Sequence, residues 1–477
     1  MASISAQMID WRFDPRSRAL FRVALGLQVL SQSLLLSRDF AFFYQPDGVY
    51  PSANPSGSPL FHLLIGGLLP LLACALVVGF LTRLATLGCY LSLIFVHGAN
   101  ADILQGGDVL LRLLLFWSLF LPLGEVWSLD SRFKWMPRLS LPRTTSLTTG
   151  ALTLQVCFVY WFAALLKSDP LWTQNGNALF YALSIEHFTT PFGLYLRQFP
   201  NLLRVLTFGT LCLEFAGPFL LLIPYQRDRL RLIAVILFVG FHLIGMQALL
   251  RIGLFPWVCA TAWLIFIPGS TWDWLTAKEA TPAGRKKEKI KRLATEQLKT
   301  AKATRAWPAL DYVCSALVIA AFLDVLTWNI ASVRGNDAMR WLTQHDVLGN
   351  ALRLDQRWNM YAPYPRSDHG WLIVAADLAN GTEVDLFTSQ PVSWDKPNDL
   401  GAYFGDDRWR RFLSNLFDEQ DPKALQAYAD YLVRRWNQQH PPGVVVQTVT
   451  IYYMKQVTQL DLTVTSPEKD AIYFYSY

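Results

Sequence analysis

Long apolar stretches that carry almost no charge constrain this 477-residue chain more than any other feature. A helix needs about 20 mostly apolar residues to cross the roughly 30 Å hydrocarbon core of a bilayer. Candidate spans occur at residues 19–36, 60–81, 84–101, 109–127, 151–166, 203–223, 230–250, 253–267 and 310–330. Charged residues make up 16% of the chain, against about a quarter in soluble domains, and the deficit lies in these stretches. A soluble protein would have no apolar phase for so many of them, so the sequence predicts an α-helical integral membrane bundle of about eight or nine transmembrane helices.

Lysine and arginine gather at the ends of the spans and predict an orientation. They cluster around residues 12–22, 132–143, 227–231 and 278–305. Cytoplasmic loops are enriched in these residues, and alternate crossings from a cytoplasmic N-terminus place all four clusters inside. A span at residues 310–330, although it carries Asp311 and Asp324, would then place the C-terminal residues outside. We expect a multi-pass protein of the cell inner (plasma) membrane.

Beyond residue 334 the pattern changes to that of a small α+β domain. Asn380 and Gly381 separate two short apolar runs, at residues 371–376 and 383–387, which is a hairpin signal. Residues 443–454 and 460–465 are expected to form a second strand pair, and residues 424–437 an amphipathic helix. The predicted organisation is a helical transmembrane domain at 1–275, a basic cytoplasmic linker helix at 276–307, a final transmembrane helix at 308–332 and an extracytoplasmic α+β domain at 333–477. The basic linker suits anionic lipid heads better than nucleic acid, and no nucleic-acid partner is expected.

Ionisable side chains inside membrane spans are expensive, so those that occur are candidates for function. They are His62, His97, Arg112, Lys167, Glu214, His242 and Arg251. The predicted topology puts His97, Lys167, Glu214 and His242 in the middle or outer half of their helices. Asp108 lies four residues before Arg112, a spacing that suits a charge pair on one helix face. The set is consistent with an outward-facing polar cavity or with structural salt bridges.

Lys167 ends the apolar run at residues 157–166. Desolvation in such a place can make a lysine a usable general base. The alternative is that Lys167 extends its ammonium group to the lipid headgroups. Spacing alone favours the second interpretation.

Several motifs follow one another in an order typical of a known family. They include Tyr44 to Pro51 in the first outer loop, Gly106-Gly107-Asp108, Trp127-Ser128-Leu129-Asp130, the segment from Val159 through Lys167 to Trp172, Phe241-His242, and Gln356 to Pro363 followed by Gly370-Trp371. In this order the chain resembles bacterial proteins with a horizontally transferred transmembrane (HTTM) domain, and the membrane domain of vitamin K-dependent gamma-glutamyl carboxylases. Lys167 takes the position of the carboxylase's proposed catalytic lysine.

The resemblance implies a membrane enzyme with a lipid-soluble, vitamin K-like quinol and Lys167 as general base. Glu214, His97 and His242 are then its catalytic partners, Asp108, Arg112, Trp172 and Glu125 belong to the substrate pocket, and no metal is expected. A protein or peptide on the extracytoplasmic side is a candidate substrate. The chain departs from the carboxylases where Glu125 stands near the place of a histidine, and where Gly106-Gly107-Asp108 replaces an asparagine-rich segment.

Two other functions stay open at this point. The chain could be a non-catalytic scaffold or receptor whose outer domain binds a partner through the aromatic-rich stretch at residues 358–371. A transporter is the third interpretation, although the sequence has no obvious inverted repeat.

Overall fold

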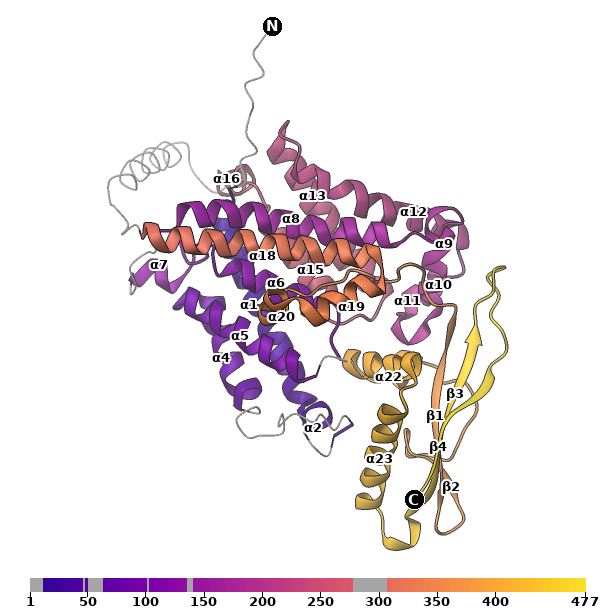
Figure 1. Cartoon of the computed structure of the whole chain (residues 1–477). Coiled ribbons are helices and arrows are strands. Elements are labelled where there is room, and N and C mark those ends of the chain that lie inside the picture. Colours follow the sequence, from indigo (N-terminus) through magenta and orange to yellow (C-terminus); the bar gives the residue numbers. More distant parts are fainter. Residues whose placement is uncertain (1–11, 46–47, 50–62, 101–102, 135–139, 278–306) are drawn as a thin grey trace.

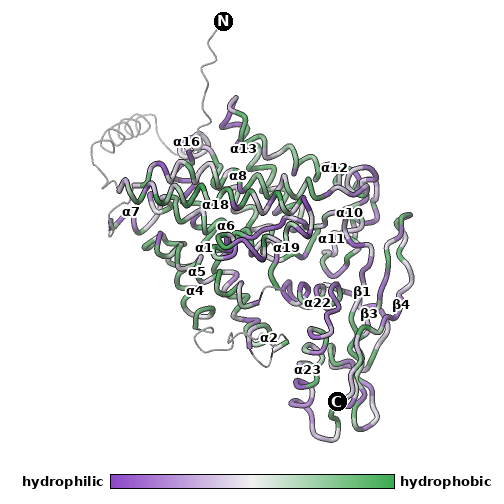
Figure 2. The backbone as a smooth tube through the Cα atoms, viewed as in Figure 1, coloured by the Kyte–Doolittle hydropathy of each residue, from purple (hydrophilic) through white to green (hydrophobic). Residues whose placement is uncertain are grey.

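The computed structural model describes residues 12–45, 48–49, 63–100, 103–134, 140–277 and 307–477. A bundle of long helices lies against a smaller α+β domain at one of its ends (Figure 1). The long helices are largely hydrophobic apart from hydrophilic ends such as the start of α13, whereas helices of the smaller domain carry many hydrophilic residues (Figure 2). The expected basic linker helix at 276–307 falls almost entirely outside the described residues, as do His62 and Asp102.

Five of the described helices are long and apolar enough to cross a membrane. They are α1 (Pro15–Arg38), α8 (Pro142–Leu166), α12 with η3 (Pro200–Ala216 and Gly217–Leu221), α13 with η4 and α14 (Arg227–Gly240, Phe241–Met246 and Gln247–Leu249), and α18 (Pro308–Arg334). Shorter apolar helices are η1 with α4 (Leu64–Leu68 and Leu69–Val78) and α15 (Phe255–Leu264). Helices α5 (Thr82–Ala99) and α6 (Gly106–Ser118) overlap the expected third and fourth spans, although α6 ends nine residues before the predicted end at residue 127. The helical membrane class is therefore confirmed, while the number of crossings stays a prediction.

The bundle helices begin where their sequences allow it. Proline occupies the first turn of α1, α8, α12 and α18, where no hydrogen-bond donor is needed. Asp14 also caps α1, because its carboxylate accepts the backbone N–H of Arg16 at 2.8 Å. Shorter helices connect these elements: α2 (Phe40–Phe43), α7 (Leu129–Phe133), α9 (Pro170–Thr173), α10 (Ala178–Ser184), η2 (Glu186–Phe188), α11 (Pro191–Leu196), α16 (Gly269–Ala277), α19 (Asn336–His345) and α20 (Val347–Leu352).

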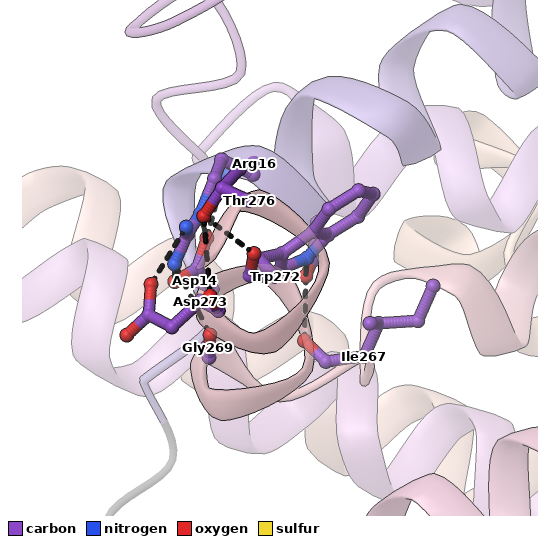
Figure 3. A network of polar contacts seen from close by, with 8 residues as sticks. Asp14, Arg16, Ile267, Gly269, Trp272, Asp273 and Thr276 are labelled. Carbon is purple, nitrogen blue, oxygen red and sulfur yellow. Dashed lines mark hydrogen bonds and ion pairs between the residues drawn. The ribbon is translucent and has the colours of Figure 1, made fainter. Parts of the chain in front are cut away.

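Polar contacts fasten the start of α1 to α16 at the end of the bundle away from the α+β domain (Figure 3). Arg16 forms ion pairs with Asp14 at 2.9 Å and with Asp273 at 2.8 Å. The Ser17 hydroxyl donates to the Ile267 carbonyl at 2.5 Å and accepts from the Trp272 indole at 2.8 Å. The basic start of the chain and the end of the helix before the basic linker therefore lie together.

The C-terminal domain contains an antiparallel sheet in the order β2-β1-β3-β4. Its strands are β1 (Asp368–Leu378), β2 (Glu383–Asp385), β3 (Val446–Val457) and β4 (Glu468–Ser476), and its helices are α21 (Leu400–Tyr403), α22 (Asp407–Glu419), α23 (Pro422–Gln439) and η5 (Pro442–Val444). The hairpin at Asn380-Gly381 is confirmed, with Gly381 at a φ of 80° in the turn. The expected helix at 424–437 is confirmed as α23.

The predicted strand at 460–465 is wrong. These residues form a turn, in which the Asp461 carboxylate accepts the backbone N–H of Thr463 at 3.0 Å and its hydroxyl at 2.7 Å. Strand β4, which follows this turn, pairs with β3 instead and forms an edge of the sheet. Most of its residues are exposed, so the buried-and-exposed alternation that identifies a strand is missing from its sequence.

The α+β domain packs on the bundle end that includes α2. Phe43 in α2 contacts the rings of Trp409 and Phe412 at centroid distances of 5.1 and 5.8 Å. Arg251, in the loop between α14 and α15, forms an ion pair with Asp399 at 2.7 Å. These contacts bring α22 against the bundle, where the two parts together enclose a cavity.

Candidate functional site

A cavity of about 470 Å³ lies between the helix bundle and the C-terminal domain. Ligand sites commonly measure about 300–1,000 Å³, so the volume suits a small organic molecule. The bundle supplies one wall, from α8, α12, η4 and α15; α22 supplies a second, and residues 357–366 a third. Mainly apolar side chains on the bundle wall face a mainly polar opposite side.

The bundle wall contains a hydrogen-bonded group of aromatic residues around Tyr160. The Tyr160 hydroxyl lies 2.9 Å from Nε2 of His242 and accepts the indole N–H of Trp263 at 2.7 Å. His242 is held inward by η4, a π-helical turn in the middle of a long helix, and such turns are frequent at functional sites. Tyr160 and His242 both line the cavity.

Lys167 and Glu214 form a buried ion pair beside this group. Nζ of Lys167 is 2.6 Å from Oε2 of Glu214, and the two side chains are 3% and 8% exposed. The Lys167 side chain therefore does not extend to the headgroups, which was the interpretation that spacing favoured. Its ammonium also lies 5.2 Å from the ring of Trp172, a cation–π distance. Glu214 itself lines the cavity, so the pair can exchange a proton with a molecule bound there.

Trp172 links this pair to the third wall of the cavity. Its indole N–H donates to the backbone carbonyl of Tyr361 at 2.9 Å. The side chain is only 2% exposed. Trp172 is therefore a positioning residue for Lys167 and for the segment at 357–366.

His97 and Asp108 lie together in a different buried group. The Gln32 amide nitrogen is 2.8 Å from Nε2 of His97 and 2.6 Å from the Asp108 carboxylate. Asp108 also accepts the backbone N–H of Gln105 and faces Arg408 at 3.7 Å. Neither His97 nor Asp108 lines the cavity, although Gln105 does. This group joins the bundle to α22 rather than surrounding Lys167.

The expected pair between Asp108 and Arg112 is replaced by other partners. The Arg112 side chain donates to the backbone carbonyl of Arg353 at 2.7 Å and forms an ion pair with Asp355 at 3.2 Å. Glu125 forms an ion pair with Arg18 at 2.7 Å, near the start of α1. Arg112 and Glu125 are therefore not part of the cavity wall as it is described.

Gln155, a residue that the sequence analysis passed over, anchors the third wall through Gln356. The Gln155 amide in α8 donates to the side-chain oxygen of Gln356 at 2.8 Å. The same oxygen accepts the Trp358 indole N–H at 3.1 Å. All three side chains are buried, so the chain after α20 is inserted into the bundle. The motif at 356–363 therefore has two roles: Gln356 and Trp358 attach it to the bundle, and residues 357–362 line the cavity.

Helix α22 contributes a polar stripe that sequence reasoning also missed. Asp407, Arg411, Ser414, Asn415 and Asp418 line the cavity, and their spacing places them on one helix face. Burial raises the pKa of Asp407 to about 6. In the sequence these polar residues look like an ordinary solvent-exposed helix face, so the hydrophobic pattern alone does not show that they line a cavity.

Opposite Ser414, burial lowers the pKa of His187 to about 3, so this imidazole is neutral at physiological pH. Its Nε2 lies 3.1 Å from the Ser414 hydroxyl. A neutral histidine with so low a pKa accepts protons poorly. The pair therefore serves as hydrogen-bonding wall rather than as a nucleophile and its base.

The sequence model of the HTTM domain matches residues 14–274, more than half of the chain. The chain belongs to the HTTM domain family. The resemblance seen in the motifs is thus confirmed for the HTTM part. Comparison with curated proteins and with solved structures finds no significant match. The HTTM domain includes Lys167, Glu214 and His242, whereas α22 and the segment at 357–366 lie beyond the match.

Proposed function

We propose that this HTTM-domain protein is a membrane enzyme that uses a lipid-soluble quinol, with the Lys167–Glu214 pair as its proton-transfer group. The observation that carries the proposal is the buried Lys167–Glu214 ion pair, 2.6 Å long, whose glutamate lines the cavity. A buried lysine–carboxylate pair is costly to maintain unless its geometry is excellent, and ionisable groups within membrane spans commonly mark function.

The cavity suits a quinol in size and in chemistry. Apolar side chains on the bundle wall include Val159, Ala163, Phe241 and Phe255. A bound quinol would supply two electrons and two phenolic protons. Glu214 provides a hydrogen-bond acceptor on that wall, and Lys167 can take up a proton only when its own proton has moved to Glu214 or to a bound molecule. The pair therefore acts as a unit in this proposal, with the lysine as general base after that transfer.

A second, protein or peptide substrate would approach from the C-terminal domain side. An open groove there, lined by Asp169, Tyr181, Tyr364 and Asp461 among others, shares Tyr364 and Pro365 with the cavity wall. The lining of the groove includes Asp169 and Pro170, two and three residues after Lys167. Carboxylase-like chemistry on such a substrate is the most specific form of the proposal.

We also propose that the C-terminal domain is extracytoplasmic and the N-terminus cytoplasmic, in the inner (plasma) membrane. Helix α16, whose Asp273 pairs with Arg16 at the basic start of α1, lies at the bundle end away from this domain (Figure 1). This supports the orientation, because cytoplasmic loops are enriched in positive charge. The domain limits at 275, 307 and 332 remain part of the proposal. Cysteine-accessibility labelling of variants at Thr276 and at Asn380 in intact cells tests the orientation.

A non-catalytic binding role is the alternative. The sequence analysis placed the partner-binding surface on the aromatic stretch at 358–371. This stretch is not exposed as a whole, because Trp358 and Trp371 are only 4% and 1% exposed. The edge strand β4 offers another surface, since Phe474 is 65% exposed on it. Exposed strand edges can pair with an added strand of a partner.

The test compares the wild type with Lys167→Met and Glu214→Gln in lipid nanodiscs. A reduced naphthoquinone is the probe, and its binding and its oxidation with oxygen consumption are measured separately. We expect both variants to bind the quinol but to oxidise it at least 10²-fold more slowly, as is typical when a general base is lost. Arg340→Gln, at an exposed side chain far from the cavity, is the matched control. Full activity in Lys167→Met would exclude the lysine from catalysis, and failure of the wild type to bind the quinol would refute the quinol itself.

A further inference from the structure

The polar stripe of α22 differs from an ordinary solvated helix face because it closes a cavity. Asp407, Arg411, Ser414 and Asp418 recur at helical spacing, and all of them face the space bounded on its other side by the apolar bundle wall. The opposite face of α22 is buried through Phe412 and Leu416, and Phe412 contacts both Tyr428 of its own domain and Phe43 of α2. The cavity is therefore amphipathic, with an apolar half in the bundle and a polar half in the C-terminal domain.

Most charges in the polar half are already matched within the protein. Arg366 forms ion pairs with Asp368 at 2.7 Å and with Asp418. Asp407 accepts the side-chain N–H of Gln105 at 2.7 Å. On the opposite, bundle wall, Glu214 is held by Lys167. These carboxylates have partners without any ligand.

Two arginines of the cavity wall differ in this respect. No carboxylate among the described residues lies within 4 Å of Arg357 or of Arg411. Among the residues that the structure describes, Arg357 donates only to the Asn336 amide oxygen, at 3.0 Å. Asp108, whose charge acts on Arg411 from a longer distance, is already held by Gln32 and Gln105. Both guanidinium groups are exposed at the cavity and keep free hydrogen-bond donors.

We propose that the cavity binds an anionic amphiphile, whose acidic head contacts Arg357 and Arg411 and whose apolar part lies along the bundle wall. A guanidinium presents paired donors that match a carboxylate or a phosphate. The Ser414 hydroxyl and the neutral His187 beside it add hydrogen bonds to the same end. The hydrophobic side chains Val159, Ala163, Phe241 and Phe255 suit an acyl or prenyl chain better than a polar one.

The proposal shares only the cavity with the proposed function, and an amphiphile bound along the same apolar wall would compete there with the quinol. Carboxylate and phosphate heads share the recognition chemistry, so a fatty acid and a lipid phosphate are both candidate sources. A neutral or zwitterionic lipid lacks the charge that the two arginines require. Ligand selectivity is thus the property to measure.

The experiment measures displacement of a fluorescent fatty acid from the full-length protein in phosphatidylcholine nanodiscs. The competitors are oleate, lysophosphatidate, lysophosphatidylcholine and oleyl alcohol, which share a chain type and differ in the head. We expect oleate or lysophosphatidate to bind at least tenfold more tightly than the other two, because a charge-assisted hydrogen bond commonly contributes that much to affinity. The tighter of the two anions identifies the source. Equal affinity for oleate and oleyl alcohol in the wild type would overturn the proposal.

Variants then locate the head group. Arg411→Gln and Arg357→Gln should each weaken the anionic competitors about tenfold and leave oleyl alcohol binding unchanged, whereas Arg411→Lys should retain part of the affinity. Arg340→Gln is the matched control, since it removes an exposed arginine outside the cavity. An unchanged selectivity for anions in the Arg357→Gln/Arg411→Gln double variant would overturn the assignment. Displacement needs no turnover, so its outcome is independent of the quinol oxidation assay.

Discussion

Removing one member of the Lys167–Glu214 pair should cost far more stability than removing both. Lys167→Met leaves the Glu214 carboxylate, 8% exposed, without the ammonium that lies 2.6 Å away. Breaking a buried ion pair in this way typically destabilises a protein by about 3–5 kcal/mol. Glu214→Gln leaves the lysine charge, which the Trp172 ring at 5.2 Å partly offsets, so its cost should fall at the lower end of that range.

The double variant Lys167→Met/Glu214→Gln tests the physical reasoning most directly. Methionine and glutamine keep nearly the volume of the original side chains and leave no buried charge. We expect the double variant to lie within about 1–2 kcal/mol of the wild type, so that the two substitutions are coupled by at least about 3 kcal/mol. Direct contact between the two residues is what permits such non-additivity.

The free energy of unfolding can be measured by titrating dodecyl sulfate into mixed micelles and following tryptophan fluorescence. Arg340→Met, which removes an exposed ion pair with 72% and 100% exposed side chains, is the control and should change the free energy by less than about 0.5 kcal/mol. If the double variant lost the sum of the two single costs, the pair would contribute through packing alone and the electrostatic account would be refuted.

Two further predictions concern other carboxylates. Burial raises the pKa of Asp407 from 3.8 to about 6. The folded state therefore binds the proton of this carboxyl group more tightly than the unfolded state does. The stability that the bound proton contributes is lost as the pH rises from about 4 through 6. Asp407→Asn should remove this component, worth up to about 3 kcal/mol, and stabilise the protein at pH 7; an unchanged pH profile of unfolding would contradict it. Asp130 in α7 accepts the backbone N–H groups of Leu81 and Thr82, both at 2.8 Å, and so caps the start of α5. Asp130→Ala should cost about 1–3 kcal/mol in the same unfolding assay, and a Thr82→Val variant, which loses only the hydroxyl bond, should cost less.

The sequence predicted those parts of the fold that depend on local pattern. Long apolar runs identified the bundle helices because a membrane span is defined by length and composition. Asn380-Gly381 identified the hairpin because few residues adopt the backbone conformation of its turn. Strand β4 escaped because an exposed edge strand has no buried face to produce alternation.

The candidate site was predicted less completely, because its partners are distant in the chain. Lys167 and Glu214 were both singled out, but 47 positions separate them, and nothing in the spacing predicts their contact. The spacing of Asp108 and Arg112 was misleading, since Arg112 turns instead toward Asp355, far along the chain. Helix α22 was not recognised as a cavity wall.

The reason lies in the burial pattern of α22. Arg408 and Arg410 are buried at 7% and 8% exposure, whereas polar residues on another face of the helix line the cavity. Reading a helix from its hydrophobic and charged residues assumes that charged side chains face water. In α22 the charged side chains of Arg408 and Arg410 are buried instead. Only the position of the helix against the bundle shows which face contacts a ligand.

Because Gln356 and Trp358 are inserted among the bundle helices, the C-terminal part of the chain is held to the bundle by side-chain contacts as well as by the peptide chain. Helix α18 is joined to α8 by the Thr144 hydroxyl, which donates to the Asp311 carboxylate at 2.7 Å, and Gln155 holds Gln356 at 2.8 Å. The attachment of the last third of the protein to the first is therefore side-chain chemistry distributed over several helices, and does not depend on the peptide connection between them. Two separately synthesised fragments, ending and beginning within residues 278–306, should reassemble into one working protein in the membrane, and a gene fission at this place would be tolerated.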